Sequence, residues 1–166
     1  ISHVLTYQCK DFDNIDGAIN QYKLDADVDF QYACIDVATA VTGDQVSLTN
    51  NHWDFSQKAL AEQFGLEKLF VINDFTAIAM SVPQIPDAKK VQVGGAEAQA
   101  NKPIAIYGAG TGLGVAHLVH SGDKWLALSG EGGHVDFAPI DADEIAVLQE
   151  LQKKYERVSA EQLLSG

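Results

Sequence analysis

The fold class is decided by residues 69–82, which read LFVINDFTAIAMSV. Residues 69–72 are all apolar, as expected for a short strand in a parallel sheet that is covered on both faces. Asn73 and Asp74 come next, and residues 75–82 are expected to form a helix that ends at Pro83. A strand that leads directly into a helix is typical of an α/β sheet.

The residues before this segment continue the alternation of strands and helices. Strands are expected over residues 4–9, 30–40 and 46–49, and helices over residues 15–24 and 57–64. Asp13 and Ser56 are the expected N-caps of the two helices, and Gly65 is expected to end the second one. We therefore expect a small α/β lobe over residues 1–84.

A second lobe is expected over residues 85–166, after a linker at residues 83–87 and an irregular stretch at residues 92–102. Its expected strands cover residues 104–107, 115–119, 124–128 and 135–139, and its expected helices cover residues 143–155 and 161–166, the last with Gly166 as its C-cap. The chain opens with Ile1 inside an expected strand and ends on a helix cap. Both ends are therefore expected to be cuts in a longer protein.

Composition and charge exclude several classes of protein. The chain has 166 residues, 46% of them hydrophobic, with a formal net charge of −12 and a pI near 4.6. This charge excludes a nucleic-acid partner, which needs a basic face, and an anionic membrane surface. No apolar run approaches the roughly 18 residues of a membrane span, and no signal peptide is visible. Cys9 and Cys34 lack a Cys-x-x-Cys spacing, so we expect reduced thiols in a cytoplasmic protein.

Asn73 and Asp74 are candidate ligand-binding residues because they follow an expected parallel strand. Ligands bind at the carboxyl ends of the strands in open α/β sheets. Asp74 could act as a general base, and the Asn73 amide could bind a hydroxyl group. Asp74 could also be the N-cap of the following helix, and both roles are compatible, since the helix dipole keeps an N-terminal carboxylate ionised.

The glycine run at residues 108–114, GAGTGLG, is a candidate anion site. It is not a dinucleotide fingerprint, because a strand rather than a helix is expected after it, and it lacks the lysine of a P-loop. A glycine turn between two strands can still form a nest of backbone N–H groups, to which Thr111 adds a hydroxyl. The alternative is an ordinary hairpin turn, although four glycines in seven residues are more than a hairpin needs.

A second glycine-rich loop, GEGGH at residues 130–134, carries a carboxylate and an imidazole. Glu131 can accept bonds from two neighbouring hydroxyls, and a neutral His134 offers one donor and one acceptor. This pairing suits a vicinal diol such as a sugar presents, although a solvated turn would have the same sequence. A protein metal site is not expected, because His117 and His120 point to opposite faces of their strand.

Three motifs in this order resemble the bacterial ATP-dependent, hexokinase-type glucokinases, which have the actin-like ATPase fold. The motifs are VINDFTA at 71–77, GAGTGLGVA at 108–116 and GEGGHVDFAP at 130–139, with shorter matches at 42–44, 49–50, 94–97 and 158–161. The resemblance implies an α/β fold of the actin-like ATPase (ribonuclease H-like) type, with part of the small lobe and the start of the large lobe. The repressor-kinase branch of this fold is excluded, because its zinc-binding cysteines are absent here.

The resemblance implies a role for five residues in binding the sugar. Asp74 matches the catalytic base that takes the proton of the sugar 6-hydroxyl, and Asn73 matches a hydroxyl ligand beside it. Glu131 and His134 match ligands at the other side of the ring, and Glu161 matches the last sugar-binding carboxylate. The residue pattern alone does not single out Glu161.

The resemblance also implies the cofactors and the reaction. Gly110, Thr111 and Gly112 match the second phosphate loop for ATP, while Mg²⁺ is held mainly by the ATP phosphates and by residues outside this chain. The implied reaction moves a phosphoryl group from ATP to the 6-hydroxyl of glucose, giving glucose 6-phosphate and ADP, the first step of glycolysis. The implied partners are glucose, ATP and a second copy in a homodimer.

The family's N-terminal Asp-x-Gly-Gly-Thr-Asn segment and its adenosine-binding part are absent here, so about half of a full-length glucokinase is expected to be present. We therefore expect no kinase activity from these 166 residues alone. The alternative function is a sugar-binding or regulatory module of the same fold without turnover. Asp74 favours the enzyme, because a module that only binds the sugar needs no base beside the 6-hydroxyl.

Overall fold

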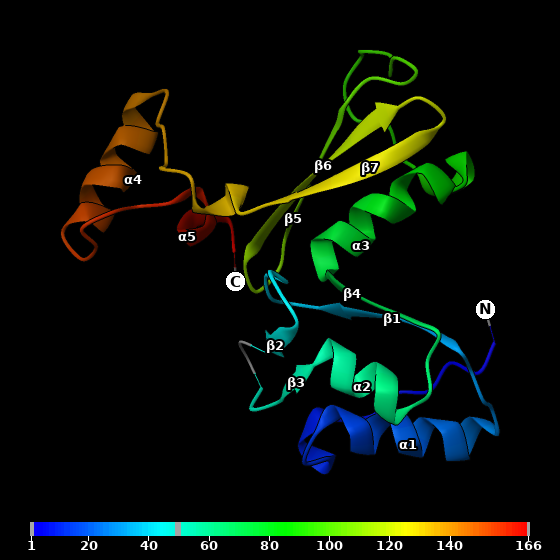
Figure 1. The fold of residues 1–166 in the computed structure, drawn as a ribbon. Coiled ribbons are helices and arrows are strands. Elements are labelled where there is room, and N and C mark those ends of the chain that lie inside the picture. Colours follow the sequence, from blue (N-terminus) through cyan, green and yellow to red (C-terminus); the bar gives the residue numbers. More distant parts are fainter. Residues whose placement is uncertain (1, 49–50, 166) are drawn as a thin grey trace. The chain divides into compact units, whose positions relative to one another are not determined.

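A computed structural model describes residues 2–48 and 51–165 (Figure 1). The chain splits into two compact units, Ile1–Asp74 and Phe75–Gly166. The units divide at the start of helix α3 (Asp74–Ser81), before the boundary at residue 84 that is expected from the sequence. Each unit has its own hydrophobic core.

The sheet of the first unit is a parallel pair, β1 (Tyr32–Val37) and β4 (Lys68–Asn73). Ile35 lies opposite Val71 in the register. Val37 and Val71 are buried on the same face, but Phe70, which points to the other face, is 60% exposed. The parallel strand at residues 69–72 is therefore confirmed, and the expectation that it is covered on both faces is wrong, because only one face packs on the core.

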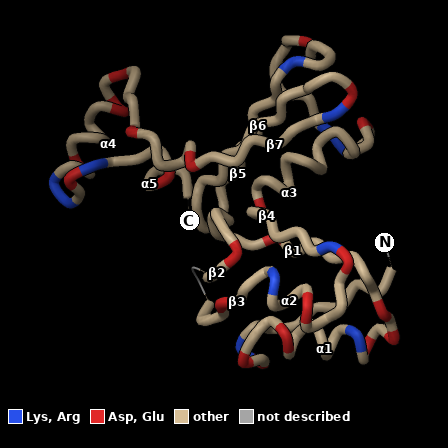
Figure 2. The backbone as a smooth tube through the Cα atoms, in the orientation of Figure 1, with Lys and Arg blue, Asp and Glu red and all other residues tan. Residues whose placement is uncertain are grey.

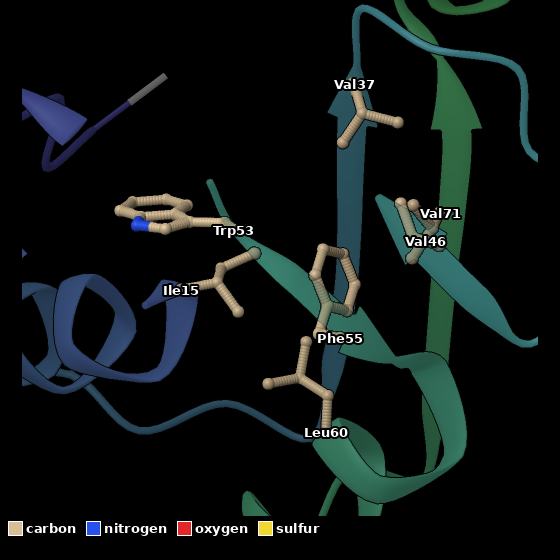
Figure 3. Close-up of a cluster of buried hydrophobic side chains, with 7 residues drawn as sticks. All are labelled: Ile15, Val37, Val46, Trp53, Phe55, Leu60 and Val71. Carbon is tan, nitrogen blue, oxygen red and sulfur yellow. The ribbon is translucent and has the colours of Figure 1, made fainter. Parts of the chain in front are cut away.

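The core of the first unit lies between this sheet, two helices and a hairpin. Helices α1 (Ile15–Ala26) and α2 (Gln57–Gln63) and the antiparallel strands β2 (Gln45–Ser47) and β3 (Asp54–Ser56) all contribute buried side chains. Figure 3 shows the seven buried side chains of this cluster: Ile15, Val37, Val46, Trp53, Phe55, Leu60 and Val71. Both helices therefore pack on the face of the sheet that carries Val37 and Val71.

Several expectations for the first unit need correction. Residues 4–9 do not form a strand: residues 2–8 have no regular structure, Val4 is 74% exposed, and a 3-10 helix, η1 (Cys9–Asp11), follows. Asn14 rather than Asp13 caps α1, because its side chain accepts the Gly17 N–H. The Ser56 cap is confirmed. Of the motifs quoted from the sequence, residues 49–50 lie outside the described residues.

The second unit is built on a three-stranded antiparallel sheet in the order β5 (Ile104–Ala109), β6 (Leu113–Ser121), β7 (Lys124–Gly130). Helix α3 packs on it, with Ala79, Ala116 and Leu118 fully buried. The three expected strands are confirmed and are longer than predicted. The short 3-10 helices η2 (Val82–Gln84) and η3 (Asp87–Lys89) lead from α3 into the irregular residues before β5.

The end of the second unit differs from the expectation in two ways. Residues 135–139 form a single bridge, Asp136 to Ser159, rather than a strand. Helix α4 (Ala142–Gln152) begins after the Asp141 cap, ends three residues earlier than expected and has no buried residue. Helix α5 (Ala160–Leu164) follows, and the expected cap Gly166 lies outside the described residues.

Charged residues occur along the backbone of both units, and acidic residues outnumber basic ones (Figure 2). In the described part of the chain, no helix is both long enough and apolar enough to cross a membrane. Cys9 and Cys34 are exposed free cysteines.

Candidate functional site

Asn73 and Asp74 lie where β4 ends and α3 begins, in the first unit. The Asn73 Nδ2 atom donates a hydrogen bond to the Asp74 Oδ1 atom at 2.9 Å, and both residues are half-buried. Asp74 is the first residue of the helix rather than the residue before it. The Asn73 amide therefore orients a carboxylate that can accept a proton.

The glycine turn of the second unit joins β5 to β6 through residues 110–112. The Gly110 N–H donates to the Gly112 carbonyl at 2.8 Å, which closes the turn. Gly110 and Thr111 are exposed to solvent. The tip of the hairpin therefore presents backbone and one hydroxyl, without any bulky side chain.

Packing explains most of the glycines in this run. A Cβ on Gly114 would lie 2.1 Å from the Phe75 ring, and one on Gly108 would lie 2.9 Å from it. A Cβ on Gly112 would lie 2.8 Å from the Glu161 Oε2 atom, while Gly110 has no neighbouring atom closer than 4.0 Å. The Phe75 ring therefore requires glycine at positions 108 and 114, whereas Gly112 faces the end of a flexible side chain. The density of glycine in the run is not by itself a sign of phosphate binding.

Glu161 joins the glycine turn to the second glycine-rich loop. It lies in the first turn of α5, whose N-cap Ser159 forms a capping box with Gln162. The Glu161 Oε2 atom accepts the backbone N–H of Leu113, the first residue of β6, at 2.9 Å. The Glu161 side chain is 27% exposed, so this carboxylate is the most shielded of the three ionisable groups in the cluster.

His134 lies between two carboxylates. Its Nδ1 atom is 3.6 Å from the Glu161 Oε1 atom, and its Nε2 atom is 3.5 Å from the Glu131 Oε2 atom. These distances exceed those of ordinary hydrogen bonds, about 2.7–3.2 Å. The imidazole nitrogens and carboxylate oxygens that face one another therefore retain the capacity to form hydrogen bonds with a ligand. The structure thus brings together Glu131, His134 and Glu161, all in the second unit.

The loop that carries His134 packs directly on the first residues of β6. Residues Gly132–His134 form the 3-10 helix η4, in which Gly133 is buried. A Cβ on Gly133 would lie 2.1 Å from the Leu113 carbonyl oxygen, so only glycine fits there. The loop and the turn therefore share Leu113 as a common neighbour.

Arg157 contacts the loop that carries His134, and it was not among the candidate residues expected from the sequence. Its Nη2 atom donates to the His134 carbonyl at 2.8 Å, and its Nε atom donates to the Asp136 carboxylate. A backbone hydrogen bond joins the same two segments, since the Ala160 N–H donates to the Val135 carbonyl at 2.9 Å. No sequence spacing pointed to Arg157. By contrast, the Ser159–Gln162 capping box could have placed Glu161 at a helix N-terminus.

The first unit also contains an open depression of about 810 Å³. Its lining residues are Cys9, Lys10, Asp36, Val37, Ala38, Leu48, Asn51 and His52. The Asn51 Nδ2 atom is buried and has no hydrogen-bond partner among the described residues. None of the predicted site residues is among those that line this depression.

The described residues contain no group of three or more His, Cys, Asp or Glu side chains that could hold a metal ion.

Known proteins match the chain over its whole length. The family model named Glucokinase matches residues 1–166. A glucokinase of Tolumonas auensis is 50% identical over 166 residues, which are 100% of this chain and 52% of that protein. A glucokinase of Psychromonas ingrahamii is 51% identical over 100% of this chain and 52% of that protein. The chain thus spans about half the length of the curated relatives that it matches.

Solved structures agree with the sequence matches. A glucokinase from an Antarctic psychrotroph superposes with a TM-score of 0.87 at 34% identity, over 98% of this chain and 51% of that one. A glucokinase of Balamuthia mandrillaris, solved with glucose, has a TM-score of 0.62 at 20% identity, over 91% and 48%, and supports the fold alone. The expected α/β fold of the actin-like ATPase type, covered in part, is confirmed. The chain belongs to the glucokinase family.

Proposed function

We propose that the full-length protein containing this chain transfers a phosphoryl group from ATP to the 6-hydroxyl of glucose, giving glucose 6-phosphate and ADP as the first step of glycolysis. The observation that carries this proposal is the cluster of Glu131, His134 and Glu161, which is tied to the glycine turn through Leu113. The family membership adds support, since relatives at 46–51% identity bear the name Glucokinase.

The sugar ligands in the second unit would be the two carboxylates and the imidazole. A carboxylate accepts bonds from two neighbouring hydroxyls, and the imidazole between the carboxylates can donate to one hydroxyl and accept from another. A site with such groups rejects analogues that lack the matching hydroxyl, because its polar atoms would then stay unpaired. This chemistry suits a pyranose better than an apolar ligand.

Asp74 would take the proton of the 6-hydroxyl as the oxygen attacks the γ-phosphate. The Asn73 amide, 2.9 Å from its Oδ1 atom, would fix the orientation of the carboxylate and offer a second polar group to the sugar. Phosphoryl transfer depends mainly on positioning and charge stabilisation, so a well-oriented acceptor is the contribution expected from this residue.

Gly110, Thr111 and Gly112 would contact the ATP phosphates. The turn fits this role in shape, because Gly110 and Thr111 are exposed and no bulky side chain blocks the hairpin tip. Mg²⁺ bound to the phosphates would neutralise charge on the transferred group. The Thr111 hydroxyl and the backbone of the turn are the groups that this chain supplies to orient the phosphates.

The test is an assay of the purified full-length protein with ATP and glucose. The proposal expects glucose 6-phosphate and ADP to form in equal amounts, with far lower rates on galactose. Binding of glucose without any turnover would instead support a sugar-binding or regulatory module. The homodimer and the cytoplasmic location stay predictions, the first of which sedimentation of the same preparation would check.

A further inference from the structure

Gly112 is the one glycine of the turn whose missing side chain makes room for a charged group. A Cβ at this position would lie 2.8 Å from the Glu161 Oε2 atom and 3.4 Å from its carboxyl carbon. Real Cβ atoms do not come this close to another atom, so either the Glu161 side chain or the turn would have to move. The end of a flexible side chain moves more easily than a hairpin backbone.

The displaced oxygen is the one that holds Leu113. The Glu161 Oε2 atom accepts the Leu113 N–H at 2.9 Å, and the Oε1 atom of the same carboxylate is 3.6 Å from the His134 ring. A shift of the carboxylate would therefore break the bond to Leu113 and change the distance to His134 together. The helix backbone at Glu161 would stay in place, because the Ser159–Gln162 capping box and the Ala160–Val135 bond hold it.

We propose that Gly112 is a positioning residue for the sugar site, because its missing side chain leaves the Glu161 carboxylate where it can hold Leu113 and face His134. The proposal rests on the function proposed above, and it adds that the turn assigned to phosphate also sets the affinity for glucose. Gly112 acts through Glu161 and needs no contact with the sugar.

A matched pair of glycine substitutions tests the proposal in the full-length protein. Gly112→Ala brings a Cβ against the carboxylate, whereas Gly130→Ala, at the end of strand β7 in the same sheet, brings a Cβ into open space. Neither glycine has a positive φ, so alanine is compatible with both backbones. Thermal unfolding of both variants checks that they remain folded.

The first measurement needs no ligand. Hydrogen exchange at the Leu113 amide reports its bond to Glu161, because a hydrogen-bonded amide exchanges slowly. We expect faster Leu113 exchange in Gly112→Ala and in Glu161→Ala, and wild-type exchange in Gly130→Ala. Unchanged exchange at Leu113 in Gly112→Ala would overturn the proposal.

The second measurement is glucose titration by calorimetry without nucleotide, arranged as a double-mutant cycle. We expect Gly112→Ala to weaken glucose binding about 10- to 100-fold, as for the loss of a bond to a charged group. In a Glu161→Ala background the same substitution should change the affinity less than about twofold. An equal loss in both backgrounds, or no loss in either, would overturn the proposal.

The two measurements separate this proposal from the proposed function. A wild-type protein that binds no glucose would contradict the sugar site, while Leu113 exchange would still decide whether Gly112 positions Glu161. Normal glucose binding with unchanged affinity in Gly112→Ala would leave the sugar site standing and overturn the role of Gly112.

Discussion

The ring of Phe75 lies directly against the backbone of Gly114, so close that a Cβ on this glycine would be 2.1 Å from two ring carbons. The same ring would be 2.9 Å from a Cβ on Gly108 of the paired strand. Phe75 thereby packs the first turn of α3 onto the β5–β6 hairpin, with Ala79 further along the helix in the same core. The contact fixes the hairpin that ends in the glycine turn.

Gly114→Ala should destabilise the second unit. The added methyl would overlap a bulky aromatic ring next to strand backbone, and overpacking of this kind costs about 1–3 kcal/mol or more. Thermal unfolding should show a lower midpoint for Gly114→Ala than for wild type. Gly130→Ala, whose Cβ meets open space, is the matched control and should unfold like wild type; equal midpoints for the two variants would refute the packing role of Phe75.

The sequence could predict the elements whose signals are local. Alternating strands and helices, the apolar run at 69–72 and the Ser56 cap sufficed for the α/β class, and the three strands after residue 103 followed from their own composition. The strand predicted over residues 4–9 is wrong because a β-type composition forms a strand only beside a partner strand. Residues 2–8 belong to no sheet. The exposure of Phe70 could not be predicted from the apolar residues around it in the sequence, because the burial of its side chain depends on which other elements pack on that face of the sheet.

The candidate site could be predicted from the sequence only in part. Glu131 and His134 stand in one loop, so their proximity was predictable, but Glu161 joins them only through tertiary contacts. The density of glycine in the run suggests a phosphate site, but Gly108 and Gly114 are explained by contact with Phe75, and Gly112 leaves room for the Glu161 carboxylate. Arg157 had no local signal at all, because its partners lie more than twenty residues away in the sequence.

Arg157→Ala should weaken glucose binding with little effect on stability. The ion pair of Arg157 with Asp136 is exposed and contributes little to folding, but the bond from Arg157 to the His134 carbonyl holds the loop that carries the imidazole. Steady-state kinetics of the full-length variant should give a KM for glucose raised roughly 3- to 10-fold with kcat nearly unchanged. The control is Lys102→Ala, at an exposed residue of the irregular segment, which should have the wild-type KM for glucose. A wild-type KM in Arg157→Ala would show that the loop does not depend on Arg157.

Protonation of Asp44 in acid should make the first unit less stable. The Ser56 hydroxyl and the Lys58 N–H donate to its carboxylate and hold its pKa below the ordinary value. Because the folded-state pKa is lowered, the stabilisation is fully present above the unfolded value, about 3.9, and is lost as the pH falls through the folded value.

Thermal unfolding of Asp44→Asn against wild type, from neutral pH downward, measures this effect. The variant should unfold at a lower temperature at neutral pH, and the difference should shrink below about pH 4. Asp123→Asn, in an exposed turn, serves as the control. A difference that is independent of pH would show that ionisation of Asp44 is not what stabilises the hairpin and α2.

The most direct test of the proposed phosphoryl transfer is Asp74→Asn in the full-length protein, assayed for both kcat and glucose affinity. The substitution keeps the size of the side chain and removes its ability to accept a proton. We expect glucose affinity within about an order of magnitude of wild type and a kcat reduced by about 10²- to 10⁴-fold. Undiminished turnover in this variant would contradict Asp74 as the base.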